Sequence, residues 1–197
     1  MGTNASKVFV GLADQSSTVG ALSRGTAIAA SGIPADYTAA VTAINAFTSS
    51  GYISEDGATL TTNLSVTKIH EWNRAAVKQV LEDFDGNISL TLIQLDEEGA
   101  KQAFGTGNVT KVAANSTHGE QLKIALGAHI ESPQAWALRF KDGNAKGIVL
   151  IPNGQVTSGA TITFASNEAI NLPITIDAND VGGQSIYVYF DDGVTTA

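Results

Sequence analysis

Residues 77–95, VKQVLEDFDGNISLTLIQL, decide the fold class of this chain. Two strand-like runs, 77–84 and 87–95, lie on either side of Asp85-Gly86. An Asp-Gly pair tolerates the positive φ angles that a two-residue β-turn requires. The stretch therefore predicts an antiparallel hairpin that turns at Asp85 and Gly86.

A short helix is predicted directly after this hairpin, over residues 96–105. Asp96 is a suitable N-cap residue, and Glu97 can pair with Lys101 one turn later. Gly105 suits the end of the helix. A second, amphipathic helix is predicted over residues 34–47, where apolar residues recur at helical spacing.

The rest of the chain has the pattern of short strands separated by turns. Strands are expected at residues 7–11, 60–72, 109–113, 121–129, 135–141, 147–151, 160–165, 170–177 and 185–190. Many short strands, 20 glycines and only two helices are typical of an antiparallel β protein. We therefore predict a mainly β fold, an antiparallel sandwich or barrel with one flanking helix and a short second helix.

The length of 197 residues fits one domain. Residues 12–32 are rich in Ala, Ser, Thr and Gly and lack periodicity, which predicts an extended N-terminal arm that is mobile in the monomer. Residues 51–57, GYISEDG, predict a turn-rich bridge. Residues 153–197 fit two interpretations, either the last strands of the main domain or a small added β-unit.

The composition excludes several classes of protein. The net charge of −8 and the pI of about 4.7 disfavour a protein that grips DNA, because phosphate binding needs clustered Lys and Arg. Without cysteine the chain has no disulfide, thiolate metal site or cysteine nucleophile. Neither a secretory signal nor a membrane-spanning helix is predicted, so we expect synthesis in a cytoplasm.

The sequence predicts no catalytic site and no cofactor. His70, His118 and His129 are far apart and fit no metal-binding motif. Adjacent strand residues point to opposite faces, so Glu82 and Asp83 can share a cleft only if a bulge intervenes. The paired acids are therefore interpreted as a solvated face, and the protein is expected not to be an enzyme.

The two tryptophans differ in context. Trp136 alternates with Leu138 and Phe140, which predicts a buried position on a strand. Trp72 ends a predicted strand, and both a core edge and an interface fit this position.

The order of elements resembles that of the major tail tube proteins of long-tailed bacteriophages. The most similar segments are GYISEDG at 51–57, KIHEW at 68–72 and the short helix that ends at Phe104-Gly105. The resemblance covers about residues 7–150. It implies a structural virion protein, assembled in the host cytoplasm, whose inner sheets join into a ring-shaped β-barrel in stacked homohexameric rings. DNA would pass through without specific binding, and the tape measure, terminator and distal tail proteins would be further partners.

Candidate residues follow from this resemblance. An acidic wall lets DNA slide whereas a basic wall binds it, so the lumen candidates are Glu82, Asp83 and Asp85, although an outward-facing position stays open for them. The candidate contacts between subunits or rings are Ser23, Arg24, Thr26, Ile53, Glu55 and Trp72. Three alternatives stay open: a secreted or surface β-sandwich binding module, a hydrolase with paired carboxylates, and another ring-forming tail protein such as a terminator or a secretion-tube protein.

Overall fold

The computed structural model describes residues 7–127, 130–157, 162, 164, 166–167 and 169–195. Its strands are β1 (Leu12–Ala13), β2 (Leu22–Gly25), β3 (Thr48–Ser49), β4 (Ile53–His70), β5 (Ala76–Leu92), β6 (Val109–Val112), β7 (Gln121–Ile124), β8 (Gln134–Asp142), β9 (Ala145–Val156), β10 (Leu172–Ala178) and β11 (Tyr187–Asp191). Its α-helices are α1 (Tyr37–Ile44) and α2 (Glu97–Phe104), and short 3-10 turns cover Ala30–Gly32 and Thr106–Asn108.

Nine strands of the described chain form one antiparallel sheet, seven of them in the order β3-β2-β8-β9-β10-β5-β4. β1 pairs with β8, and β11 pairs with β9. β6 and β7 form a separate two-stranded ribbon. The predicted mainly β, antiparallel class with two helices is confirmed.

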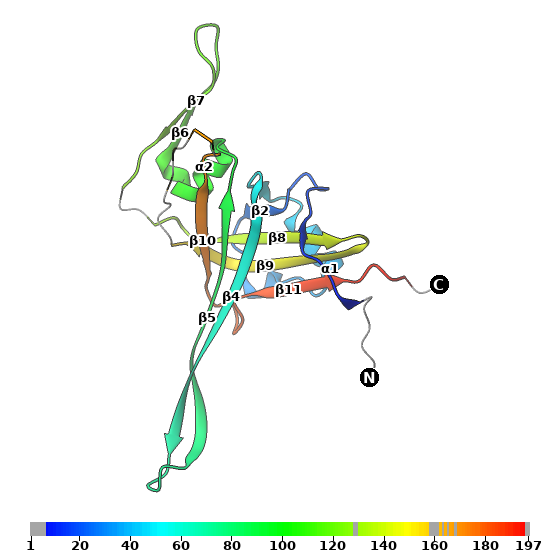
Figure 1. The fold of residues 1–197 in the computed structure, drawn as a ribbon, viewed down its shortest axis with the longest axis vertical. Helices are drawn as coiled ribbons and strands as arrows, with labels where there is room; N and C mark the ends of the chain where they lie inside the picture. The colour runs from blue at the N-terminus through cyan, green and yellow to red at the C-terminus, as the bar shows by residue number, and fades with distance from the viewer. Residues whose placement is uncertain are drawn as a thin grey trace.

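The sheet changes direction along β9. Residues 146–150 of β9 pair with β11, whereas residues 154–156 pair with β10. Figure 1 shows β8, β9 and β11 running across β10, β5 and β4. This bend gives the fold its sandwich-like shape.

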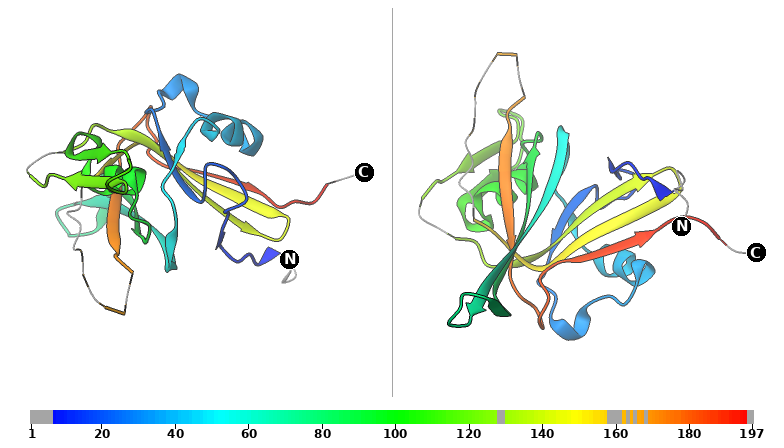
Figure 2. Two further views of the ribbon diagram at one scale, coloured as in Figure 1. Left: turned by 90° about the horizontal axis from the view of Figure 1, so that it is seen from above. Right: turned by 60° about the horizontal axis from the view of Figure 1, so that its bottom comes forward.

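β9 is buried on both faces, because its alternate residues pack into two different clusters. Val149 and Ile151 lie in the main core with Trp136 and with apolar residues of β5 and β10. Ile148 and Leu150 lie in a second cluster beneath α1. Figure 2 shows the two helices well apart, with α1 against β9 and β11 and α2 near β10 and β6.

The predicted turn at Asp85-Gly86 is wrong. β5 runs through both residues without a break, and the chain turns at residues 71–75 instead. Gly86 is buried and does not have a positive φ angle. A Cβ atom there would lie 2.7 Å from Cδ1 of Ile186, so this glycine permits a close approach between segments.

Two further loop predictions are corrected by the pairing of strands. Within residues 51–57, β4 already begins at Ile53, and Gly57 (φ 75°) lies in an irregularity of the β4–β5 register. Within residues 12–32, β1 and β2 join the sheet, and Leu22 and Ser23 are fully buried. This buried part of the segment is therefore part of the folded subunit and not a free arm.

Both predicted helices and the buried position of Trp136 are confirmed. β10 lies between β9 and β5, and β11 lies beside β9, so both are strands of the main sheet. The predicted strand at 160–165 falls mostly outside the described residues. The strand predicted at 121–129 is shorter in the structure, where β7 ends at Ile124. His129 also lies outside the described residues.

Candidate functional site

The hairpin of β4 and β5 projects from the body of the subunit. β5 pairs with β10 only from Asn87 to Leu92, so β4 is the one described strand that pairs with the segment from the turn to Gly86. Figure 1 shows this segment extending along the longest axis of the molecule, away from the body. An isolated two-stranded hairpin is only marginally stable in water, which makes this segment a candidate for contact with another chain.

One face of the projecting hairpin is apolar. Ile88, Leu90 and Leu92 of β5 face the core, and the same face continues outward beyond them. It carries two directly opposed pairs, Leu64 with Phe84 and Val66 with Leu81, all four of which are exposed. We call these four residues the apolar patch.

The opposite face of the sheet is polar from the hairpin into the body. Residues on it alternate with the core residues and are paired with one another across the three strands. They are Thr59, Thr61, Asn63 and Ser65 of β4, Asp83, Asp85, Asn87, Ser89 and Thr91 of β5, and Pro173, Thr175 and Asp177 of β10. We call this set the polar face. It contains three aspartates and no Lys or Arg.

A β-bulge places the three predicted lumen residues together. Ser65 pairs with Asp83 but the next residue, Val66, pairs with Leu81, so Glu82 is the extra residue on β5. The Ser65 hydroxyl donates to Oε2 of Glu82 at 3.5 Å, which holds Glu82 toward the polar face. Glu82, Asp83 and Asp85 are exposed and lie on one side of the hairpin.

The outer edge of β4 has no strand partner among the described residues. β4 is 18 residues long and pairs with β5 alone. A long edge strand presents a row of unpaired backbone N–H and C=O groups, which is a template for pairing with another chain. This edge is therefore a second candidate contact surface.

The residues predicted as inter-subunit contacts are not brought together. Ser23 and Arg24 are buried in β2, where they pair with β3 and β8, so they offer a neighbour little surface. Ile53 is half-buried at the start of β4, and Glu55 is exposed just after it. The other two, Thr26 and Trp72, are exposed, and Trp72 lies in the turn at the tip of the hairpin.

Sequence reasoning missed the apolar patch and most of the polar face. The period-two alternation of residues 87–92 was a usable signal, because polar and apolar residues there strictly alternate. The incorrect turn at Asp85-Gly86 hid the continuation of both faces beyond residue 86.

Within the described part of the chain, no group of three His, Asp or Glu side chains is placed to hold a metal ion. No helix there is long and apolar enough to cross a membrane. The candidate contact surfaces are extended faces and edges of a sheet.

Comparison with known families decides the identity. The family model described as "Phage tail tube protein" matches residues 12–196. The chain belongs to this family. No curated protein matches it. This tail tube protein is therefore a structural component of the virion tail, assembled in the host cell, and not an enzyme.

Proposed function

We propose that this tail tube protein assembles into hexameric rings, that the rings stack into a tube, and that the polar face lines the lumen through which DNA passes. Closure of identical subunits by rotation gives a ring, and axial contacts that do not close give a filament. The inner strands of the subunits would then join into a ring-shaped β-barrel.

The negative charge of the polar face is the main observation that supports this proposal. DNA has about one negative charge per 1.7 Å of helix axis, so a wall with Lys or Arg would bind it. Asp83, Asp85 and Asp177 give the polar face a negative charge, and the nearest cation on the same side of the hairpin, Lys78, lies beyond this face toward the tip. A wall of small polar and acidic residues lets DNA move without adhesion.

The free edge of β4 and the apolar patch support assembly. Both would be covered when a neighbouring subunit packs against the hairpin, which removes an open edge and apolar surface from water. Thr26, Ile53 and Glu55 lie near the start of β4 or the end of β2 and are proposed contacts to a neighbour. The ends of the tube would meet the terminator and distal tail proteins, and the lumen would hold the tape measure protein before DNA.

Assembly is tested by negative-stain electron microscopy of the purified protein over a series of concentrations. Hollow tubes whose length increases with concentration are the expected result. A single closed ring at every concentration would favour a terminator-like protein instead. A monomer at every concentration would contradict self-assembly of the purified protein.

The lumen is tested with phage particles that carry the double substitution Asp83→Lys and Asp85→Lys. We expect tails of normal length and slower release of DNA, with a deficit that shrinks at higher salt because salt screens the new attraction. The matched control is Asp191→Lys with Asp192→Lys, which changes the net charge equally at the end of β11, away from the polar face. Equal rates of DNA release from the two variants would place these aspartates outside the lumen.

A further inference from the structure

We propose that Trp72 at the hairpin tip of one subunit inserts into a cavity beside α2 of a second copy in the next ring. This inference rests on the proposed tube. It assigns the axial contact to one side chain and one receiving site.

Trp72 is a large apolar side chain without cover in the subunit. Its relative exposure is 101%, the highest among the exposed large hydrophobic residues. The turn that carries it is defined by two hydrogen bonds: the N–H of Glu71 donates to the carbonyl of Ala75, and the N–H of Arg74 donates to the carbonyl of Glu71, both at 2.9 Å. A defined turn therefore holds the indole ring at the tip, and tryptophan is one of the residue types enriched among interface hot spots.

The cavity lies between α2, the start of β8 and the end of β9, and has a volume of about 320 Å³. Its rim includes Leu126 and Ile130, which are 74% and 69% exposed. Its wall includes Phe104 and Trp136, so an entering aromatic ring would meet aromatic and aliphatic groups. This volume is at the lower end of ligand pockets and suits a single ring system better than a strand.

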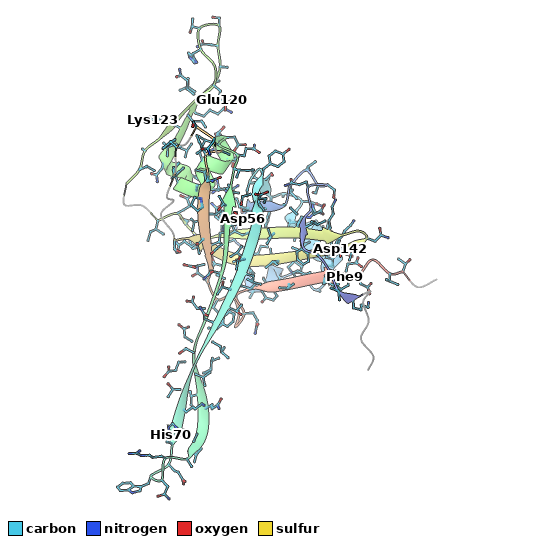
Figure 3. The ribbon with its side chains drawn as sticks, in the orientation of Figure 1. Phe9, Asp56, His70, Glu120, Lys123 and Asp142 are labelled. Carbon is cyan, nitrogen blue, oxygen red and sulfur yellow. The ribbon has the colours of Figure 1, made fainter. Side chains whose placement is uncertain are left out.

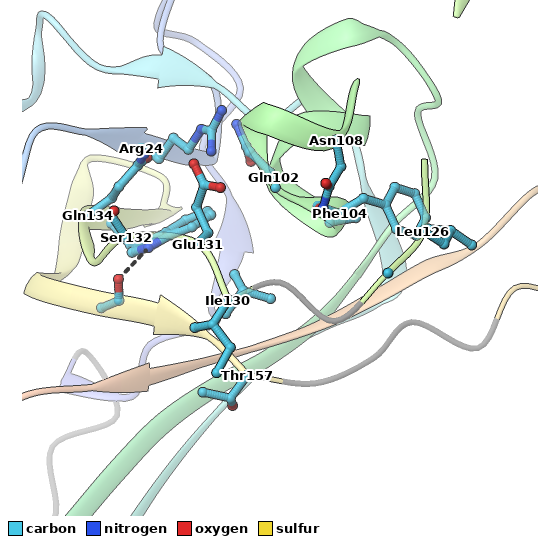
Figure 4. A pocket seen from close by; sticks show the side chains of 16 residues that line it. Arg24, Gln102, Phe104, Asn108, Leu126, Ile130, Glu131, Ser132, Gln134 and Thr157 are labelled. Carbon is cyan, nitrogen blue, oxygen red and sulfur yellow. Dashed lines mark hydrogen bonds between the residues drawn. The ribbon is translucent and has the colours of Figure 1, made fainter. Parts of the chain in front are cut away.

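The wall of the cavity also contains a polar group without a partner. The side chain of Gln102 is buried, with 2% exposure, and neither its Nε2 nor its Oε1 has a hydrogen-bond partner among the described residues. Figure 4 shows Gln102 beside Arg24 on one side of the cavity and Leu126 on the other. A buried indole N–H needs an acceptor, and Oε1 of Gln102 is one to which no described residue donates.

Arg24 of the same wall already has partners. Its Nη2 lies 3.7 Å from Oε2 of Glu98 and donates to the Thr106 hydroxyl at 3.3 Å. Burial lowers the pKa of this guanidinium, and the nearby charges of Glu98 and Glu131 oppose that shift. Arg24 therefore already interacts with Glu98 and Thr106 of its own subunit, whereas Oε1 of Gln102 can accept a hydrogen bond from an incoming donor.

The knob lies at one end of the subunit, whereas the cavity lies in its body, beside α2. Figure 3 shows His70, next to the tip, at one end of the long axis and Glu120 and Lys123 at the other. Stacking along this axis would bring the tip of one subunit toward the α2 end of the next. A knob and a cavity on different parts of one chain make a heterologous contact, which propagates as a filament.

The charges of the two ends are complementary. Residues 66–80 carry Lys68, Arg74 and Lys78 against Glu71, a net charge of +2. Residues 96–131 carry five acids against three lysines, a net charge of −2. On a chain whose net charge is −8, the tip is a local basic region, and its attraction to the α2 end orients the two subunits head to tail.

Fluorescence tests the burial of Trp72 directly. The chain has two tryptophans, and the other one, Trp136, is already buried. We expect the emission of the wild-type protein to shift to shorter wavelength when tubes form, and the emission of Trp72→Phe to stay constant over the same concentrations. Wild-type emission that does not change on tube formation would overturn the proposal.

Two substitutions at exposed sites test the pairing. Trp72→Ala removes the knob, and Leu126→Arg obstructs the rim of the cavity. Each is expected to raise the concentration needed for tube formation by about thirtyfold or more, since truncation of a buried hot-spot tryptophan has at least that effect. The matched control Tyr52→Ala removes another exposed aromatic ring and is expected to polymerise like the wild type.

A mixture of the two variants gives the sharpest result. The intact tip of Leu126→Arg rings fits the intact cavity of Trp72→Ala rings, but no third ring can add. Below the raised concentrations at which each variant forms tubes, double rings are therefore expected in the mixture and single rings in each variant alone. If Trp72→Ala forms tubes like the wild type, the axial contact lies elsewhere while the tube stands; if the wild type forms no tubes, both proposals fail.

Discussion

Replacement of Asp14 by Asn is expected to lower the free energy of unfolding of the subunit by about 3–5 kcal/mol. Asp14 follows β1 directly and is 1% exposed. Its Oδ2 accepts a hydrogen bond from Nη2 of Arg139 at 2.8 Å, and its Oδ1 lies 3.6 Å from Nζ of Lys141. The N–H of Ser16 donates to Oδ1 at 3.1 Å.

The magnitude follows from the burial of Arg139. This side chain is also buried, its Nε has no hydrogen-bond partner in the described part of the chain, and Asp14 supplies its close counter-charge. Asn keeps the size of the side chain but removes the charge, which leaves a buried guanidinium uncompensated. The effect is therefore expected at the high end for a single substitution.

Urea unfolding of the monomer, followed by far-UV circular dichroism at neutral pH, measures this effect. With a denaturant dependence of about 2 kcal/mol per M, the midpoint is expected to fall by about 1.5–2.5 M. The control is Asp192→Asn, because Asp192 pairs with Lys7 at 2.6 Å on the surface, where ion pairs contribute little. Equal midpoints for the two variants would refute the reasoning.

Two further predictions concern the same subunit. Burial raises the pKa of Asp14, but the hydrogen bonds from Ser16 and the charges of Arg139 and Lys141 outweigh it, so the pKa lies below its ordinary value. The stability from Asp14 is then present above the unfolded-state pKa of about 4 and is lost as pH falls through the lower, folded-state pKa. The urea midpoints of wild type and Asp14→Asn should therefore converge as pH falls below about 4. Gly147→Ala is expected to cost about 1–3 kcal/mol, because its Cβ would overlap the ring of Phe140, while Gly11→Ala, with nothing within 4 Å, should change the urea midpoint little.

Local patterns in the sequence predicted the elements whose stabilising contacts are close in the chain. Asp96 accepts a hydrogen bond from the N–H of Gly99 at 2.7 Å, and Asp36 accepts one from Ala39 at 2.8 Å, so both helices begin where capping residues occur. The buried position of Trp136 followed from its alternation with Leu138. These features need only neighbours a few residues away.

The predicted turn at Asp85-Gly86 is wrong because local sequence could not decide between a turn and a strand at this position. An Asp-Gly pair suits a turn, yet the same glycine also suits a strand against which another segment packs closely. The choice depends on Ile186, which comes from a distant part of the chain. The turn instead forms around Arg74, which has a positive φ of 66°. Because Arg74 is not a glycine, the sequence did not predict a positive φ at this position.

The candidate site was predicted in composition but not in geometry. Glu82, Asp83 and Asp85 were selected for their charge, and the sequence required a bulge before adjacent acids could share one side. The bulge exists because the register shifts between the β4 residues Ser65 and Val66. Register is set by the pairing of two whole strands, so no single residue in the sequence predicts it.

The sequence by itself determined the antiparallel β class, the two capped helices and the acidic, cysteine-free character of a structural tail protein. Only the tertiary structure decided that β10 lies beside β5, that the polar face continues onto the projecting hairpin, and that Trp72 is left at its tip. The reason is physical: helix caps and alternation are local, whereas strand order, register and the uncovered surfaces depend on contacts between segments far apart in the chain.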